Sequence, residues 1–416
     1  MEELNDSFLN IENKDDLKVL MLGGRRCGKT SVLASMFESI INGQTNSFLT
    51  VSDDTKPEMK GIETKDTLPG KTAELIDLLA KPNNATFLVD QKPSRYWWDY
   101  RLKIQLPGTN KEMFINFRDV PGEFCRQGNE HEAEVREYVK HCDVFVVVVD
   151  TPYMMEVDNI HNPSCTEGVN LSVNRIPDIQ QYLTGINDNE GFNSKMVVFC
   201  PVKCERWYNA GRIDEVNEKL MQVYSTCITN LMAYKKMDIS IIPILTAGNI
   251  EFFEQRDAYI LQDEPKNFDL DKVRYKTESG SKVIRCCMQT SKQLRLSNGK
   301  PYTKRESDVV NEDPEAVIKG TNLARPYSWF KIRHHDDANL NGFKPLNCEQ
   351  LPLHIIRFML AKRDNEKTFW ETILDLLGEF FGTIDPDELK KVLMKMQAAD
   401  IIKDDVDGIV HLKKAY

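Results

Sequence analysis

The sequence predicts an α/β fold with a mostly parallel sheet, helices on both faces and one antiparallel strand at an edge. Short apolar runs alternate with longer amphipathic segments over residues 17–250, which is the pattern of strands joined by helices. The run VFVVVV at 144–149 is apolar throughout, as expected for a strand buried on both faces. Two alternating segments flank Pro-Gly-Thr-Asn at 107–110, and this hairpin supplies the antiparallel strand.

The first elements follow from these patterns in chain order. A strand is expected at 17–22, and a helix follows a glycine-rich loop as far as about residue 41. The polar region 44–66 is predicted to be a mobile loop, and KTAELIDLLA at 71–80 a short helix. The arms of the hairpin are WWDYRLKIQL and KEMFINFRDV.

Three further strands complete the predicted sheet. They lie at 143–150, 195–200 and 239–245. A charged helix at about 130–141 precedes the first of them, and a long amphipathic helix at about 213–235 precedes the last.

Residues 250–345 carry many charges and turn signals, with strand-like pieces in KVIRCCM and YSWFKI. After them, QLPLHIIRFMLAKR at 350–363 is expected to form an apolar helix that packs on the core. Helices at about 367–381 and 386–398 and a short strand near 408–413 follow. The expected organisation is a polar arm (1–16), a main domain (17–362) with insertions at about 44–95 and 250–345, and a C-terminal helical segment (363–416).

Composition restricts the class of function. The 416 residues are 41% hydrophobic and 28% charged, which is ordinary for a globular protein. A net charge of −10 argues against a mainly electrostatic attachment to nucleic acid or anionic lipid. The longest apolar run is too short to span a membrane, and the N-terminal MEELNDSF does not resemble a signal peptide. With ten scattered cysteines, we expect a cytoplasmic protein with neither membrane nor nucleic-acid partners.

The segment GGRRCGKT after the first strand has the spacing of a phosphate-binding loop. Its glycines allow successive backbone N–H groups to bind phosphate oxygens at the start of a helix. Lys29 is expected to reach the β- and γ-phosphates and Thr30 to ligate Mg²⁺. The alternative is a glycine-rich turn with an unrelated lysine. The residues predicted to hold phosphate are Gly23, Gly24, Arg26, Cys27, Gly28, Lys29, Thr30 and Ser31.

A second motif, Asp119-x-x-Gly122, follows the strand MFINF. Asp119 can hold Mg²⁺ through water, and the N–H of Gly122 can bind the γ-phosphate. An ordinary turn at the end of a strand is the alternative.

Two later segments are candidates for binding a base. FCPVKCER at 199–206 is close to the pattern [NT]KxD, in which a lysine stem covers guanine and a carboxylate accepts two of its hydrogen bonds. Lys203 and Glu205 would take those roles, although Val202 and the glutamate depart from the pattern and a solvated charged loop is the alternative. Three residues after the last strand are expected at the guanine edge: Thr246, Ala247 and Gly248.

In this order, the four segments resemble P-loop GTPases of the translation-factor-related class, which includes Ras-like proteins. The resemblance covers about residues 17–250, with 351–362 as the last helix of that fold. DVPGE, PVKCE, TAGN and NCEQLPL are most similar to the bacterial double-GTPase family, which is associated with conflict or defence modules. The resemblance implies GTP or GDP with Mg²⁺ as ligands, and protein partners that recognise the switch loops.

Three further residues depart from the Ras-like pattern: Glu123, and Arg25 and Arg26 at loop positions that are commonly small. Glu123 stands where those enzymes have the glutamine that orients water, and a carboxylate beside a γ-phosphate is repelled unless it is protonated or paired. It could instead act as a general base. Arg25 either points to solvent or lies over the γ-phosphate and supplies charge to the transition state.

The sequence does not choose the switch threonine that would complete the Mg²⁺ shell. It must lie between the first helix and the hairpin, where the candidates are Thr50, Thr55, Thr64, Thr67, Thr72 and Thr86. Three functions remain open: a GTP-hydrolysing switch, a nucleotide-binding scaffold with little turnover, and a P-loop ATPase.

Overall fold

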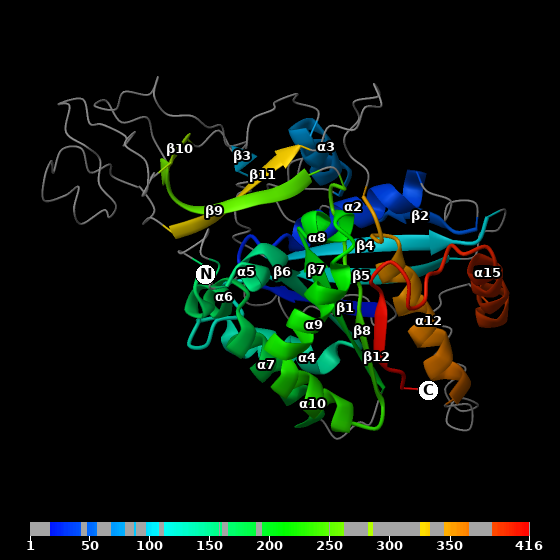
Figure 1. The fold of residues 1–416 in the computed structure, drawn as a ribbon. Coiled ribbons are helices and arrows are strands. Elements are labelled where there is room, and N and C mark those ends of the chain that lie inside the picture. Colours follow the sequence, from blue (N-terminus) through cyan, green and yellow to red (C-terminus); the bar gives the residue numbers. More distant parts are fainter. Residues whose placement is uncertain are drawn as a thin grey trace, which may run out of the picture.

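The computed structural model describes residues 17–42, 48–55, 68–79, 87–88, 97–107, 112–157, 159, 165–188, 194–248, 250–261, 282–285, 325–332, 345–365 and 385–415. Within this part of the chain, eight strands form the main sheet (Figure 1). Their order is β12 (Val410–Lys413), β8 (Met237–Ile241), β7 (Lys195–Val202), β6 (Val144–Asp150), β1 (Leu17–Gly23), β5 (Glu112–Asp119), β4 (Trp98–Gln105) and β2 (Thr50–Asp53).

The predicted α/β fold with a mostly parallel sheet is confirmed. Strands β8, β7, β6, β1 and β5 are parallel to one another, and β4 pairs with β5 as the antiparallel arm of the predicted hairpin. Strand β12 pairs antiparallel with β8, and β2 pairs antiparallel with β4.

Strand β2 corrects the prediction that 44–66 is a loop. Its four residues pair with Leu102–Gln105 of β4, and only Val51 among them is buried. With one apolar residue among Thr, Ser and Asp, the segment has no strand signal of its own, and pairing along the exposed edge of β4 forms it.

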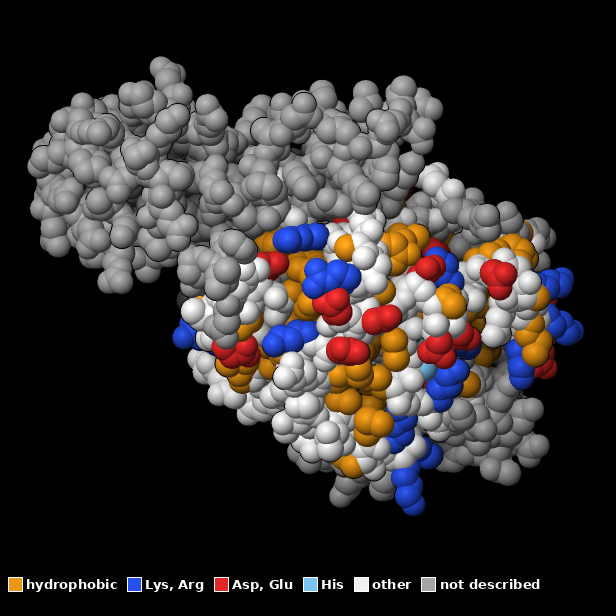
Figure 2. All heavy atoms as spheres, viewed as in Figure 1, with side chains coloured by type: hydrophobic (Ala, Val, Ile, Leu, Met, Phe, Trp, Pro, Cys, Tyr) orange, Lys and Arg blue, Asp and Glu red, His pale blue; other side chains and the backbone are white. Residues whose placement is uncertain are grey.

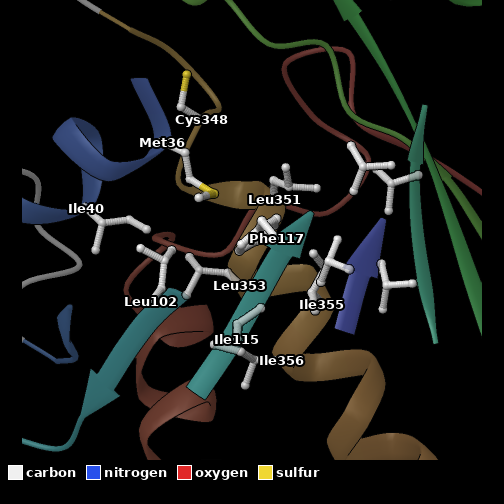
Figure 3. Close-up of a cluster of buried hydrophobic side chains, with 14 of the residues drawn as sticks. Met36, Ile40, Leu102, Ile115, Phe117, Cys348, Leu351, Leu353, Ile355 and Ile356 are labelled. Carbon is white, nitrogen blue, oxygen red and sulfur yellow. The ribbon is translucent and has the colours of Figure 1, made fainter. Parts of the chain in front are cut away.

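One face of the main sheet is covered by α2 (Lys29–Asn42), α12 (Gln350–Asn365) and α15 (Pro386–Ala398). The helices at 350–363 and 386–398 were predicted, and the apolar residues of α12 enter the core as expected. Figure 3 shows this core around Phe117 of β5. The side chains that meet there include Met36, Ile40, Leu102, Ile115, Leu351, Leu353, Ile355 and Ile356.

The opposite face is covered by α4 (Glu132–His141), α7 (Ile176–Thr184), α9 (Ile213–Val223) and α10 (Ser225–Ala233). The single helix predicted at 213–235 is therefore two helices that meet at Tyr224. The ring of Tyr224 is fully buried beside Phe199 of β7, with 5.1 Å between centroids. The remaining helices are α3 (Leu68–Leu79) and the shorter α5 (Thr151–Met155), α6 (Glu167–Val173), η3 (Gly185–Asp188) and α8 (Glu205–Asn209).

A second, antiparallel sheet joins the two segments predicted to be insertions. Its order is β10 (Lys282–Arg285), β9 (Ile250–Leu261), β11 (Arg325–Ile332) and β3 (Phe87–Leu88). Strands β10 and β11 confirm the two strand-like pieces, whereas β9 was not predicted. Phe252 of β9 stacks on Trp207 of α8 and meets Phe330 of β11, so the second sheet packs beside α8. The helix predicted at 367–381 lies outside the described residues.

Basic and acidic side chains are interspersed over the face of the molecule shown in Figure 2. No helix in the described part of the chain is long and apolar enough to cross a membrane.

The topology places a site at the carboxyl ends of the central strands. The chain leaves β1 and returns on one side as β5, and then crosses to the other side as β6. Adjacent loops diverge at such a reversal and leave a crevice beyond the strand ends, where ligands of open α/β sheets bind. The loops after β1, β5, β6 and β7 all lie at this edge because the four strands are parallel.

Candidate functional site

The loop after β1 has the form expected of a phosphate-binding loop. It turns through residues 24–28 directly into α2, where the N–H of Val32 donates to the carbonyl of Gly28 at 2.9 Å. Cys27 is fully buried, and burial raises the pKa of its thiol, so this side chain is an apolar anchor rather than a reactive group.

Lys29 folds back over the loop. Its Nζ donates to the carbonyls of Gly23 and Gly24, both at 3.2 Å, and the residue is 7% exposed. Burial alone would lower the pKa of Lys29, but Asp119 and Glu123 are among the groups that raise it. A buried positive charge is therefore available beside the backbone N–H groups of the loop.

Thr30 and Asp119 are brought into contact, as their predicted roles require. The Thr30 hydroxyl donates to Asp119 Oδ2 at 2.6 Å, because the pairing of β5 with β1 places Asp119 beside Met21. Asp119 is 1% exposed, and burial raises the pKa of its carboxyl against the opposing charge of Lys29. Its other oxygen, Oδ1, has no hydrogen-bond partner among the described residues. A buried carboxylate oxygen and an adjacent hydroxyl are oxygen donors of the kind that Mg²⁺ takes.

Gly122 brings the second motif against the first. A Cβ placed on Gly122 would lie 2.3 Å from the backbone N of Arg25 and 2.4 Å from the carbonyl carbon of Gly24. Only glycine allows this approach, so the turn after β5 and the phosphate-binding loop form one wall.

Glu123 is paired on both sides. Its Oε1 accepts a hydrogen bond from Arg25 Nη1 at 3.3 Å, and its Oε2 accepts one from Arg175 Nη2 at 3.2 Å. The pairing offsets the expected repulsion of a phosphate, and each carboxylate oxygen keeps a further lone pair, so a general-base role for Glu123 stays a prediction. Arg175 precedes α7 and was not predicted, because no motif or periodicity distinguishes it from other arginines.

Lys203 lies between the phosphate-binding loop and the end of β6. Its Nζ donates to the carbonyl of Arg26 at 3.2 Å and pairs with Asp150. Asp150 is 2% exposed and was missed in the sequence, although its position directly after VFVVVV at the end of a central strand could have indicated it. Burial raises the pKa of Asp150 against the charge of Lys203.

Glu205 is turned inward. It is 2% exposed and accepts backbone hydrogen bonds from Ala247 and Gly248, and burial raises the pKa of its carboxyl to about 7. Ser35 of α2 donates to the carbonyl of Thr246 at 2.6 Å on the other side of the same loop. The structure therefore gathers the base-binding candidates, but it shows Glu205 holding the loop 246–248. Its contact with guanine stays a prediction.

Of the described candidates for the switch threonine, Thr55 and Thr72 use their hydroxyls in hydrogen bonds within the fold, and Thr50 is exposed. Thr50 lies in β2, Thr55 accepts a hydrogen bond from the Arg101 N–H at 3.1 Å, and Thr72 is buried with its hydroxyl on the carbonyls of Ala34 and Leu68. The remaining candidates, Thr64, Thr67 and Thr86, lie outside the described residues. Ser31 is half-buried in the first turn of α2, and its contact with phosphate stays a prediction.

The sequence did not reveal one cluster of metal-ligand types. In the described part of the chain, His354, Asp404 and His411 have ligand atoms within 4.8 Å of one another. Arg357 Nη2 already lies among them, at 2.8 Å from Asp404 Oδ1, 3.0 Å from His354 Nδ1 and 3.1 Å from His411 Nε2. A guanidinium in that position repels a cation, so this group is an ion-pair network.

No protein-family model matches the sequence, and no curated protein does. Among solved structures, the Ski7 GTPase-like domain of S. cerevisiae, bound to GTP, is 12% identical over 78% of this chain and 72% of its own, with a TM-score of 0.29. RocCORdC of Roco2 from Methanosarcina barkeri, bound to GDP, is 14% identical over 56% of this chain, with a TM-score of 0.22. This chain spans 44% of that structure. Similarity at this level assigns neither ligand nor activity.

Proposed function

We propose that this protein binds a guanine nucleotide with Mg²⁺ and hydrolyses GTP as a conformational switch. The hydrogen bond between Thr30 and Asp119 carries the proposal, because it joins the phosphate-binding loop to the end of β5 beside the buried charge of Lys29. An unpartnered buried oxygen on Asp119 adds a site for a cation or its water.

The phosphates would lie on the backbone N–H groups of residues 24–30. Lys29 would exchange its two carbonyl partners for the β- and γ-phosphates, and Gly122 would donate its N–H to the γ-phosphate. Mg²⁺ would be held by the Thr30 hydroxyl directly and by Asp119 through water, and it would neutralise charge on the phosphate oxygens.

The base would lie along the stem of Lys203, whose Nζ is fixed by the carbonyl of Arg26. Residues 246–248 would form its edge, and Glu205 fixes their position through its bonds to Ala247 and Gly248. Protein partners would recognise the segment after Asp119 when the γ-phosphate orders it. The resemblance to the double-GTPase family favours a bacterial defence module as the setting.

A nucleotide-binding scaffold with little turnover is the second candidate. It is favoured by Glu123, because arginines hold both carboxylate oxygens and this residue stands where Ras-like enzymes have the glutamine that orients water. The two candidates share a binding site and differ in phosphate release.

The test is to identify the nucleotide released when the purified protein is denatured, and then to follow phosphate release with GTP and with ATP. We expect guanine nucleotide and release from GTP, whereas bound GTP without release supports the scaffold. Lys29→Ala should abolish both activities, and Lys195→Ala, which removes a part-buried lysine paired with Asp143, is the matched control. Release from ATP alone, or normal binding by Lys29→Ala, contradicts the proposal.

A further inference from the structure

We infer that Arg175 binds the γ-phosphate of the nucleotide. Without a triphosphate Arg175 is paired with Glu123, and the γ-phosphate takes the place of the Glu123 carboxylate. The inference rests on the proposed function. It adds a residue from the α6–α7 junction to a phosphate site otherwise built from the loops after β1 and β5.

The backbone of Arg175 is held in an unfavourable conformation. Its φ of 52° and ψ of 36° lie in the left-handed region, which is costly for an arginine. Among the described residues, the basic ones with positive φ are Arg26, Arg175 and Lys203. Each belongs to the candidate site, where Lys203 donates to the carbonyl of Arg26 and Arg175 pairs with Glu123. Strain of this kind is retained where the surrounding structure fixes it, and it concentrates at binding sites.

Asn174 fixes the junction to the end of β6. It is fully buried, its Oδ1 accepts the N–H of Asp150 at 2.7 Å, and its Nδ2 donates to the carbonyl of Asp150 at 3.2 Å. A further bond from Nδ2 to Asn170 Oδ1 at 2.9 Å holds the side chain within α6. These contacts fix the backbone position of the next residue, Arg175.

The junction also lies directly on the phosphate-binding loop. A Cβ placed on Gly24 would lie 1.7 Å from the carbonyl oxygen of Val173, so the two backbones touch. Arg175 therefore starts beside the loop and contacts Oε2 of Glu123, the neighbour of Gly122, while Arg25 contacts Oε1.

An incoming phosphate has to compete with carboxylates for the arginines at this point. Arg25 and Arg175 share the single carboxylate of Glu123, with side-chain exposures of 38% and 18%, and Asp178 lies 3.9 Å from Arg175 Nη1. Arginine forks bind phosphate through charge-assisted hydrogen bonds, and a γ-phosphate carries more charge than one carboxylate. GTP can therefore displace Glu123 from Arg175, whereas GDP has no γ-phosphate to do so.

The displacement would be visible in tryptophan fluorescence. Phe124, next to Glu123, lies with its ring centroid 6.0 Å from that of Trp97 and 4.0 Å from that of His131. Movement of Glu123 changes the surroundings of Trp97, so GTP and GDP should give different emission.

The experiment measures the dissociation constants of GTP and GDP for the full chain and for Arg175→Gln, with Mg²⁺ present. We expect Arg175→Gln to raise the dissociation constant of GTP by about tenfold or more and to change that of GDP by less than about twofold. In Arg175→Gln, the tryptophan emission should be the same with GTP as with GDP. Arg175→Lys, which keeps the charge, should restore part of the preference. Arg212→Gln, which breaks an exposed arginine–glutamate pair at the start of α9, should change neither constant.

Glu123→Gln provides a second test that does not require Arg175 to be replaced. It removes the competing anion, so GTP should bind more tightly while GDP is unchanged. A wild-type protein that binds no guanine nucleotide overturns the proposed function and this inference together. A wild type that binds both, with an unchanged GTP-to-GDP ratio in Arg175→Gln, overturns this inference alone.

Discussion

Gly122 is the residue at which the two phosphate-binding segments touch. Because the atoms facing its missing Cβ are backbone atoms of Gly24 and Arg25, neither can move without moving the loop. We expect Gly122→Ala to destabilise the fold by about 1–3 kcal/mol and to weaken GTP binding by at least about tenfold.

Thermal unfolding and nucleotide titration check this prediction. Gly185→Ala is the matched control, because nothing lies within 4 Å of its Cβ position and its φ of −71° suits alanine. That variant should stay within about 0.5 kcal/mol of wild type. Equal GTP affinity in the two variants would mean that the turn after β5 is not part of the phosphate site.

Sequence reasoning located some of these residues and missed others for one physical reason. Thr30 and Asp119 were expected together because each belongs to a local motif directly after a predicted strand, and both motifs imply a role at one Mg²⁺. Arg175 and Asn174 follow α6, and the course of a connecting segment depends on tertiary contacts that local pattern does not encode. The inward turn of Glu205 is likewise a loop contact, with amides more than forty residues further along the chain.

At the scale of elements, α12 is held to the C-terminal segment by Arg357. It forms two bonds to Asp404, at 2.6 and 2.8 Å, and contacts both His354 and His411. Burial, then the charge of Arg357, lowers the pKa of His354 to about 3, and the bonds from Arg357 lower the pKa of Asp404 against its burial. His354 is therefore neutral in the folded protein at pH values where it is charged in the unfolded chain.

This difference predicts a stability that falls in acid. Folding lowers the pKa values of both His354 and Asp404 from their unfolded values of 6.5 and 3.8. The contribution of each residue to folding stability is therefore complete above its unfolded pKa and is lost as the pH falls below that value. Below pH 6.5, His354 alone should cost about 1.4 kcal/mol per pH unit until its folded pKa is approached. Urea unfolding across this range should show that slope, with a flatter one in His354→Gln.

His141→Gln is the control, because His141 lies on the surface of α4 with 44% of its side chain exposed. It should keep the wild-type slope. A wild-type slope in His354→Gln as well would show that this network does not carry the acid sensitivity.

Elements with a strong apolar pattern were the ones predicted correctly. Strands β1 and β6 and helix α15 lie where their periodicity placed them. Strand β2 was missed because three of its four residues are polar, and the break at Tyr224 was missed because the amphipathic pattern continues through it.

At the scale of the whole molecule, the second sheet could not be predicted from local pattern. Its strands β3 and β11 pair Phe87 with Phe330 and Leu88 with Trp329, across more than two hundred residues of chain. Such pairing is non-local, so the sequence indicated β10 and β11 as separate strand-like pieces but not the sheet that they form with β9 and β3. Because Phe252 stacks on Trp207 in α8, which starts at Glu205, this sheet also supports the base-binding side of the proposed site.

The architecture thus places every candidate site segment at one edge of the main sheet, and the central claim is that one Mg²⁺–nucleotide complex occupies that edge. Calorimetric titration of the full chain with GTP, with Mg²⁺ and then with a chelator, tests this most directly. We predict one site per chain, weakened by at least about tenfold on chelation and absent in Lys29→Ala. Absence of GTP binding by the wild type, or equal binding by Lys29→Ala, would contradict the account.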